Sequence, residues 1–175
     1  MWKKTFISTF IAQVLSIVGF SFALPFLPFF ISELGIKDIP SQTYWAGITL
    51  SASGFTFVLF SPLWGHLADK HGKKIMVVRS MFAGTLILFL MSFVKSVKQL
   101  LICRLLQGAL TGTIVASITL VASVVPVEKS GFTLGMMQAA VSIGNSIGPL
   151  IGGFFADRIG YRNTFRLGGI LTFLG

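Results

Sequence analysis

The sequence predicts an all-α membrane protein that crosses the bilayer several times. Of its 175 residues, 54% are hydrophobic and only 11% are charged, and the mean hydropathy is +0.86. A soluble domain carries about 25% charged residues. Long apolar runs alternate with short charged connections, and each run is long enough to span a hydrocarbon core as a helix.

The apolar runs predict six spans, the last of them cut off where the sequence stops. Pro25 and Pro28 are expected to kink the first span in its outer part. That run is too long for a cleavable signal peptide, so we expect it to be retained. The stretch 65–74 is interpreted as a short basic loop, with Asp69 near the start of the third span. The predicted spans are residues 5–31, 44–64, 75–94, 99–125, 132–155 and 167–175.

The charge pattern predicts orientation and argues against other classes of protein. The net charge of +9 lies mostly in the connections, where cations meet lipid headgroups, so no nucleic-acid partner is expected. Lys73 and Lys74 oppose Lys37 alone across the first loops, which favours a cytoplasmic N-terminus in the cell membrane. His66 and His71 have no ligand cluster around them, so no metal site is expected.

Two blocks of the sequence resemble one another and suggest an internal repeat. Residues 65–74 and 153–162 match, or keep the same charge, at six of ten positions. The first block follows span two and the second follows span five, so the three-span units would be inverted relative to one another. A chance likeness between two helix ends is the alternative.

Arg104 is the one ionisable residue well inside a predicted span. A charge at membrane depth is costly unless it is paired or faces a polar cavity, which makes Arg104 a functional candidate. Arg104, Gly108, Gly112 and Ala116 recur at i+4 steps and are expected to form one stripe of the span-four helix, and Gln107 lies beside it as a candidate substrate contact. The alternative is that the side chain reaches back to the interface.

Span five carries a stripe of small residues on one face. Ordinary close helix packing is one explanation, and a bent gate element is the other. Gln138 and Asn145 are the amides of this span and are candidate substrate contacts. The stripe and its neighbours are Ala140, Gly144, Gly148, Pro149, Gly152 and Gly153.

Sequence patterns for nucleotide-driven or enzymatic chemistry are absent. The sequence has no Walker A motif, no H-E-x-x-H or G-x-S-x-G pattern and no pair of carboxylates inside a span. We therefore expect neither a cofactor nor an enzymatic activity.

Three motifs, in order along the chain, resemble the major facilitator superfamily. They are Gly65-x-Leu67-Ala68-Asp69-Lys70-x-Gly72-Lys73-Lys74, Arg104-Leu-Leu-Gln107-Gly108, and Gly144-x-x-x-Gly148-Pro149-x-x-Gly152-Gly153. The third is similar to a motif of drug:proton antiporters. Two further patterns are similar to a bacterial multidrug efflux branch of the family: Leu24-Pro25-Phe-Leu-Pro28 and Trp45-x-Gly47.

The resemblance implies a fold and a set of roles. The chain would be the N-terminal six-helix half of a twelve-helix protein, built from inverted three-helix repeats. Arg104 would take part in proton coupling, and the span-five glycines would favour exchange. Two departures are that span one carries no carboxylate and that Lys70 stands where arginine is usual. The gate between the two halves would consist of Gly65, Asp69, Gly72, Lys73 and Lys74.

The resulting functional hypothesis is proton-coupled efflux of amphipathic drugs by alternating access. Its partners would be the cargo, protons, the lipid bilayer and a C-terminal six-helix half. Two alternatives stay open: uptake or exchange of a small polar metabolite, and a non-transporting or half-size membrane protein.

Overall fold

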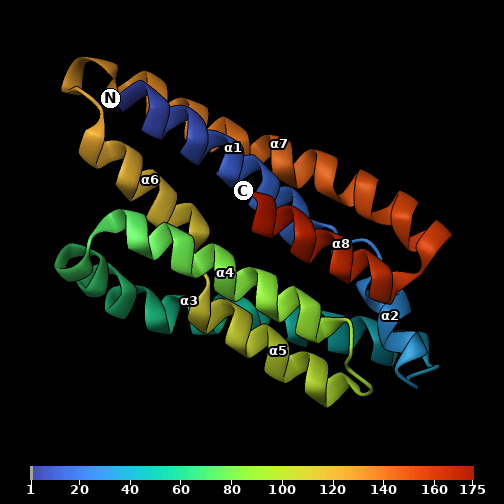
Figure 1. The fold of residues 1–175 in the computed structure, drawn as a ribbon. Coiled ribbons are helices and arrows are strands. Elements are labelled where there is room, and N and C mark those ends of the chain that lie inside the picture. The colour runs from blue at the N-terminus through green and yellow to red at the C-terminus, as the bar shows by residue number, and fades with distance from the viewer. Residues whose placement is uncertain (1) are drawn as a thin grey trace.

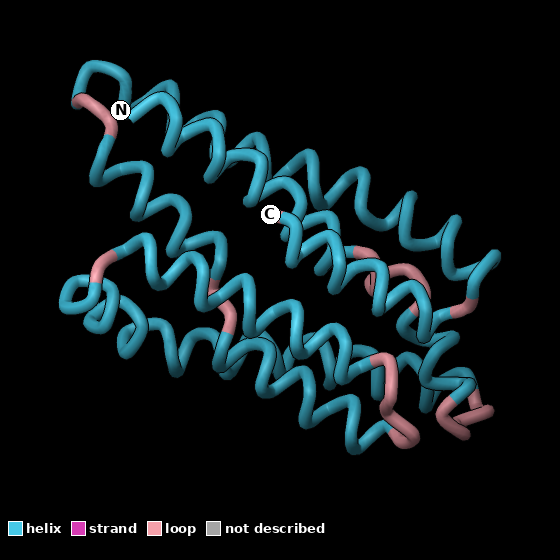
Figure 2. The backbone as a smooth tube through the Cα atoms, in the orientation of Figure 1, coloured by secondary structure: helices cyan, strands magenta, loops and turns pink. Residues whose placement is uncertain are grey.

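The computed structural model describes residues 2–175 as an elongated bundle of eight helices, with no strand in that range (Figure 1). The connections between the helices are short (Figure 2). The helices are α1 (Trp2–Ser21), α2 (Leu27–Glu33), α3 (Ile39–His71), α4 (Lys73–Met91), α5 (Val97–Leu110), α6 (Thr113–Val124), α7 (Val127–Ile159) and α8 (Tyr161–Leu174).

Five segments of the described chain are long and apolar enough to cross a membrane, which confirms a polytopic all-α fold. They are Trp2–Ser21, Ile39–His71, Lys73–Met91, Val97–Val124 and Val127–Ile159. The helix α8 (14 residues) follows the fifth of these segments and is not among them.

The kink predicted for span one is present as a complete break. Helix α1 ends at Ser21, and α2 starts at Leu27 with Pro28 in its first turn. Proline is tolerated in a first turn because the N–H that it lacks has no partner there.

The loop predicted at 65–74 is wrong. Helix α3 continues through His71, and α4 starts at Lys73, so Gly72 alone separates them. Gly72 has a φ of 95°, a conformation that glycine adopts without strain. Asp69 therefore lies in the last turn of α3 and not at the start of the next helix.

Span four is also not the continuous helix that its stripe of small residues predicted. It divides into α5 and α6 at Thr111 and Gly112, and Gly112 has a φ of 124°. The break turns Ala116 out of register with Arg104 and Gly108. The wider loops predicted around 126–131 and 156–166 are likewise helical, apart from Pro126 and Gly160.

Helices α3 and α7 are the longest elements, with 33 residues each. At 1.5 Å per residue each measures about 50 Å, which exceeds a hydrocarbon core of about 30 Å. Asp38 caps the N-terminus of α3, and its carboxylate accepts a hydrogen bond from the Ser41 N–H at 3.0 Å. Hydrogen bonding to Ser41 lowers the pKa of Asp38.

The inverted repeat is visible in the positions of the helix ends. Gly72 and Gly160 lie 88 positions apart, and both separate a 33-residue helix from the next one with a positive φ. Each glycine N–H also donates to the carbonyl four residues earlier, of Ala68 and Ala156, at 3.0 Å. With the same offset, the break between α1 and α2 corresponds to the break between α5 and α6. The two units run in opposite directions through the bundle (Figure 1).

Helix packing follows the same symmetry. The long helix of each unit packs on the first helix of the other unit, α3 on α5 and α7 on α1, while α4 packs on α8. The largest buried cluster joins α2, α4, α5 and α8 around Leu27, Phe30, Met91, Leu100 and Phe165. This arrangement leaves Arg104 of α5 between the two units.

Candidate functional site

Arg104 is buried in the bundle and does not reach back to the interface. Its side chain is 4% exposed. Nη1 donates a hydrogen bond of 3.0 Å to Oε1 of Gln107, one turn further along α5. Nε and Nη2 are also buried and have no partner among the described residues. The guanidinium therefore keeps unused donors.

A cavity of about 330 Å³ lies beside this guanidinium. Its walls come from α1, α3, α5 and the start of α6, so both units contribute to it. Most of the lining is apolar, and Gln107, the hydrogen-bond partner of Arg104, is among its polar members. The lining residues include Ile17, Phe20, Leu50, Phe57, Arg104, Gln107, Gly108, Thr111 and Thr113. A largely apolar wall with a few convergent polar groups is typical of a small-molecule site.

No carboxylate of the described chain neutralises Arg104. The five acidic residues of the sequence all lie at or beside helix ends: Glu33, Asp38, Asp69, Glu128 and Asp157. A buried charge without a partner is costly. The structure thus retains a destabilising group at the cavity, which is characteristic of a functional residue.

The residues expected to form the gate gather around the end of α3. Asp69 is exposed and makes no ion pair with any described residue. Gly65, Asp69 and Lys73 line a second cavity, of about 170 Å³, between α3, α4 and α6. Gly72 links the two helices, and Lys74 is exposed. Asp69, Lys73 and Lys74 make no ion pair among the described residues, so their charges are available to groups outside the described chain.

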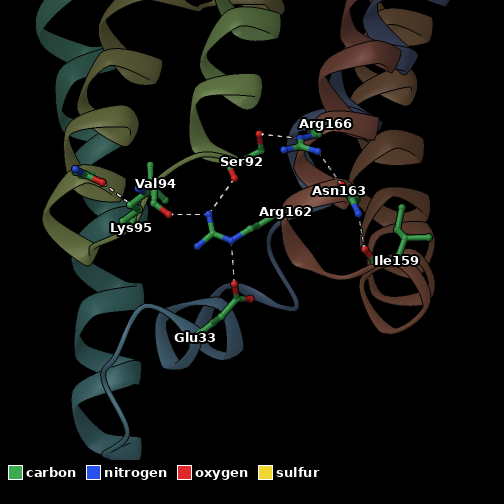
Figure 3. Close-up of polar contacts among 9 residues, drawn as sticks. Glu33, Ser92, Val94, Lys95, Ile159, Arg162, Asn163 and Arg166 are labelled. Atoms are coloured by element: carbon green, nitrogen blue, oxygen red, sulfur yellow. Dashed lines mark hydrogen bonds and ion pairs between the residues drawn. The ribbon is translucent and has the colours of Figure 1, made fainter.

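The opposite end of the bundle carries the second copy of the repeat, in which Arg162 makes contacts within the chain (Figure 3). Arg162, the counterpart of Lys74, donates to Oε1 of Glu33 at 2.9 Å. It also donates to the carbonyls of Ser92 at 3.0 Å and Val94 at 2.8 Å. Arg162 thereby ties α2 and α8 to the end of α4.

Removing Arg162 is expected to destabilise the protein more than removing the charge of Glu33. Glu33→Gln loses a solvent-exposed ion pair, which costs about 0–1 kcal/mol. Arg162→Ala frees two backbone carbonyls as well, and we expect about 1–3 kcal/mol. Thermal unfolding in detergent measures both. Equal melting temperatures for the two variants would show that the carbonyl contacts contribute nothing.

The span-five glycines divide into two groups in the structure. Three of these glycines are buried against α1 and the residue that follows it: a methyl group would collide with Ile17 at Gly144, Ser21 at Gly148 and Phe22 at Gly152. Gly153 faces open space. The close approach also lets the Ser21 hydroxyl donate to the Gly144 carbonyl at 3.0 Å.

The three amides expected to contact substrate are not brought together. Gln107 is buried and lines the Arg104 cavity. Gln138 and Asn145 lie on the exposed face of α7, and the cavity has no lining from that helix. Pro149 lies inside α7 and is half-buried. A substrate role for Gln138 and Asn145 stays a prediction.

Sequence analysis missed a pair of residues at the break in span four. Trp64 donates from Nε1 to the Ala109 carbonyl at 2.6 Å, and Arg79 donates from Nη1 to the Leu110 carbonyl at 2.8 Å. The Arg79 guanidinium carbon stacks 3.5 Å from the centre of the Trp64 ring. Arg79 lies in the second turn of α4. In the sequence it follows Lys70, Lys73 and Lys74 closely, so it groups with the cations of that connection.

The architecture defines a class. An all-helical bundle of inverted three-helix units, with a buried cation beside a cavity between them, is a polytopic membrane protein built in the manner of secondary transporters. The chain belongs to the Major Facilitator Superfamily, whose family model matches residues 9–175.

Multidrug efflux proteins are among its relatives. The chain is 38% identical over 173 residues to the multidrug resistance protein MdtG of Proteus mirabilis (strain HI4320) and to the multi-drug resistance efflux pump PmrA of Streptococcus pneumoniae serotype 4. Each alignment covers 99% of this chain and 43% of the relative, so the chain spans less than half the length of these proteins.

A solved structure has the same fold. The crystal structure of the human organic anion transporter MFSD10 (TETRAN) matches with a TM-score of 0.75 at 19% identity. The match covers 99% of this chain and 47% of that one. A chain that forms one six-helix half of a twelve-helix major facilitator fold is expected to cover slightly less than half of each of these proteins, as it does.

Proposed function

We propose that this chain is the N-terminal half of a proton-driven multidrug exporter that works by alternating access. The observation that carries the proposal is the buried Arg104, which lines a largely apolar cavity and has two guanidinium nitrogens without partners among the described residues. An apolar wall suits amphipathic cargo. The names of the similar MdtG and PmrA proteins support multidrug efflux.

Arg104 would act in proton coupling through its fixed charge. A carboxylate that approaches the guanidinium is stabilised in its ionised form, and one that moves away takes up a proton more readily. The described chain has no carboxylate at this depth. The titrating group would then be supplied by the C-terminal half, together with the other wall of the cargo site.

The cluster at the end of α3 would act as the gate between the halves. Asp69 is exposed there and makes no ion pair within the described chain, and it lines the cavity between α3, α4 and α6. The free charges would pair with groups of the second half in one of the two transport states and separate in the other.

Asp69→Asn is expected to slow transport far more than Lys70→Arg. The first variant removes the charge that would lock one state, and we expect roughly a tenfold lower efflux rate for the loss of a charged hydrogen-bonded contact. The second keeps its charge at an exposed position. Dye efflux from energised cells measures both rates at matched expression. Equal rates for the two variants would contradict the gate.

Transport by the complete protein tests the proposal directly. Everted vesicles that contain it should accumulate a lipophilic dye when a pH gradient, acidic inside, is imposed, and a protonophore should abolish accumulation. Accumulation without a gradient, or of polar metabolites in place of lipophilic dyes, would overturn the proposal. A drug-susceptibility panel in cells lacking their own efflux pumps identifies the cargo.

The proposed location is the cell membrane, with the N-terminus in the cytoplasm. The N-terminus, the connection from α3 to α4 and the connection from α6 to α7 lie at the same end of the bundle (Figure 1). Lys3, Lys4, Lys73 and Lys74 gather at that end, as the positive-inside pattern favours. Labelling of a cysteine introduced at Lys74 should require a membrane-permeant reagent.

A further inference from the structure

We propose that Trp64 and Arg79 are positioning residues for Arg104, which hold the break in span four and link it to the gate at the end of α3. This inference rests on the proposed transport function. It concerns the pair of side chains that no motif of the sequence contains.

The break between α5 and α6 leaves carbonyl groups without partners in the helix. The last four carbonyls of any α-helix lack the N–H donors of a following turn. At α5, the Gln107 carbonyl accepts from the N–H and the hydroxyl of Thr111, at 2.9 and 2.6 Å. The Ala109 and Leu110 carbonyls instead receive the Trp64 indole and the Arg79 guanidinium.

The two donors also support one another. The guanidinium of Arg79 stacks 3.5 Å from the Trp64 ring centre, and such cation–π contacts strengthen when they are shielded from water. The positive charge lies at the C-terminal end of α5, where the helix dipole favours a cation. The pair therefore fixes both the angle and the register at which α5 ends.

The end of α5 in turn determines where Arg104 points. Arg104 bonds to the Gln107 side chain, and the backbone carbonyl of Gln107 is held by Thr111 at the break. A rotation of the last turn of α5 would carry Gln107 with it and move the guanidinium relative to the cavity. Placement within a fraction of an ångström matters for groups that act in chemistry or coupling.

The same pair lies next to the gate. Trp64 directly precedes Gly65, and both residues line the smaller cavity together with Asp69, Lys73 and Arg79. A shift of the last turns of α3 when Asp69 changes partner would therefore pull on the Ala109 carbonyl. This contact gives the gate a direct mechanical connection to the segment that carries Arg104.

The repeat shows that packing alone does not require these side chains. With the offset of 88 positions, Gly152 occupies the place of Trp64 and Leu167 the place of Arg79. In that unit the Gly152 backbone simply approaches Phe22 closely. The counterpart of Arg104 is Ser16. The indole and the guanidinium thus occur only in the unit that has an arginine to position.

Three substitutions in the complete transporter test the inference, with proton-driven dye efflux measured across a range of pH. Arg79→Gln should lower the maximal rate by about tenfold or more and shift the pH midpoint, with dye binding within about threefold of wild type. Arg79→Lys, which keeps a cation at the Leu110 carbonyl, should recover most of the rate. Trp64→Phe should give a smaller loss, because phenylalanine keeps an aromatic ring beside Arg79 and only the donor to the Ala109 carbonyl is lost.

Two matched controls separate positioning from general stability. Trp45→Phe changes the indole at the other end of α3, which makes no hydrogen bond among the described residues. Arg158→Gln removes an exposed cation that stacks on Phe154 at 4.0 Å. Both should keep the wild-type pH profile. A wild-type profile for Arg79→Gln, or a loss that merely follows a lower melting temperature, would overturn the inference.

A structural readout keeps the test independent of transport. A cysteine placed at Ile114, which lines the Arg104 cavity just after the break, is alkylated without any gradient in a Cys103→Ala background. Arg79→Gln should change its alkylation rate by about fivefold or more, and Arg158→Gln should not. An unchanged rate would overturn the positioning role, whereas failure of wild-type efflux would overturn only the proposed function.

Discussion

Arg104→Ala is expected to abolish proton-driven efflux while the protein inserts and becomes no less stable. The buried guanidinium has two nitrogens without partners and no carboxylate beside it among the described residues. Removing an uncompensated buried charge relieves a cost in folding, although the Gln107 side chain loses one donor. Activity and stability should therefore move in opposite directions.

The measurement is dye accumulation in energised vesicles, alongside thermal unfolding of the purified protein. We expect at least a hundredfold lower accumulation rate, and a melting temperature equal to or above that of wild type. Arg158→Ala, at an exposed position on α7, is the matched control and should transport normally. Unchanged accumulation by Arg104→Ala would remove the residue from the mechanism. A large fall in melting temperature would mean that the guanidinium is compensated by groups outside the described chain.

Gly152→Ala and Gly153→Ala are expected to have opposite effects although the residues are neighbours. A methyl group on Gly152 would lie 2.6 Å from the Cα and 2.8 Å from the carbonyl carbon of Phe22, so α1 and α7 must separate. Forcing extra volume into a packed contact costs about 1–3 kcal/mol. At Gly153 nothing lies within 4 Å, and alanine stabilises a helix by about 0.5–1 kcal/mol relative to glycine.

Thermal unfolding in detergent and the dye efflux rate check this pair of variants. Gly152→Ala should lower the melting temperature and the efflux rate together, because the α1 wall of the Arg104 cavity moves. Gly153→Ala should raise the melting temperature slightly and keep transport. If Gly153→Ala loses transport as well, that glycine acts in the proposed interface with the second half.

The five membrane-crossing segments and the inverted repeat are largely predictable from the sequence. Hydropathy locates a span because a helix that faces lipid must be apolar along its length. The repeat is detectable because residues 65–74 and 153–162 match, or keep the same charge, at six of ten positions, and Gly72 and Gly160 end equivalent helices. The ends of the helices were less predictable, since α3 and α7 continue as helices through the charged stretches that were expected to be loops.

Arg104 is likewise a candidate from the sequence alone, because a single charge inside an apolar run needs a reason to be there. The break at Gly112 was not predictable, since a glycine inside a membrane helix is compatible with both a continuous and a broken helix. The partners that make the break stable, Trp64 and Arg79, come from two other helices.

Composition, charge pattern and motif spacing determined that this chain is a polytopic helical membrane protein, and they indicated an inverted repeat and a charge inside span four. Those features depend on each residue's own chemistry and position along a helix. The tertiary structure alone decided which glycines face another backbone, that Arg162 engages Glu33 while Asp69 stays free, and that Trp64 and Arg79 meet at the end of α5. These features depend on contacts between distant segments, and helices must pack before such contacts exist.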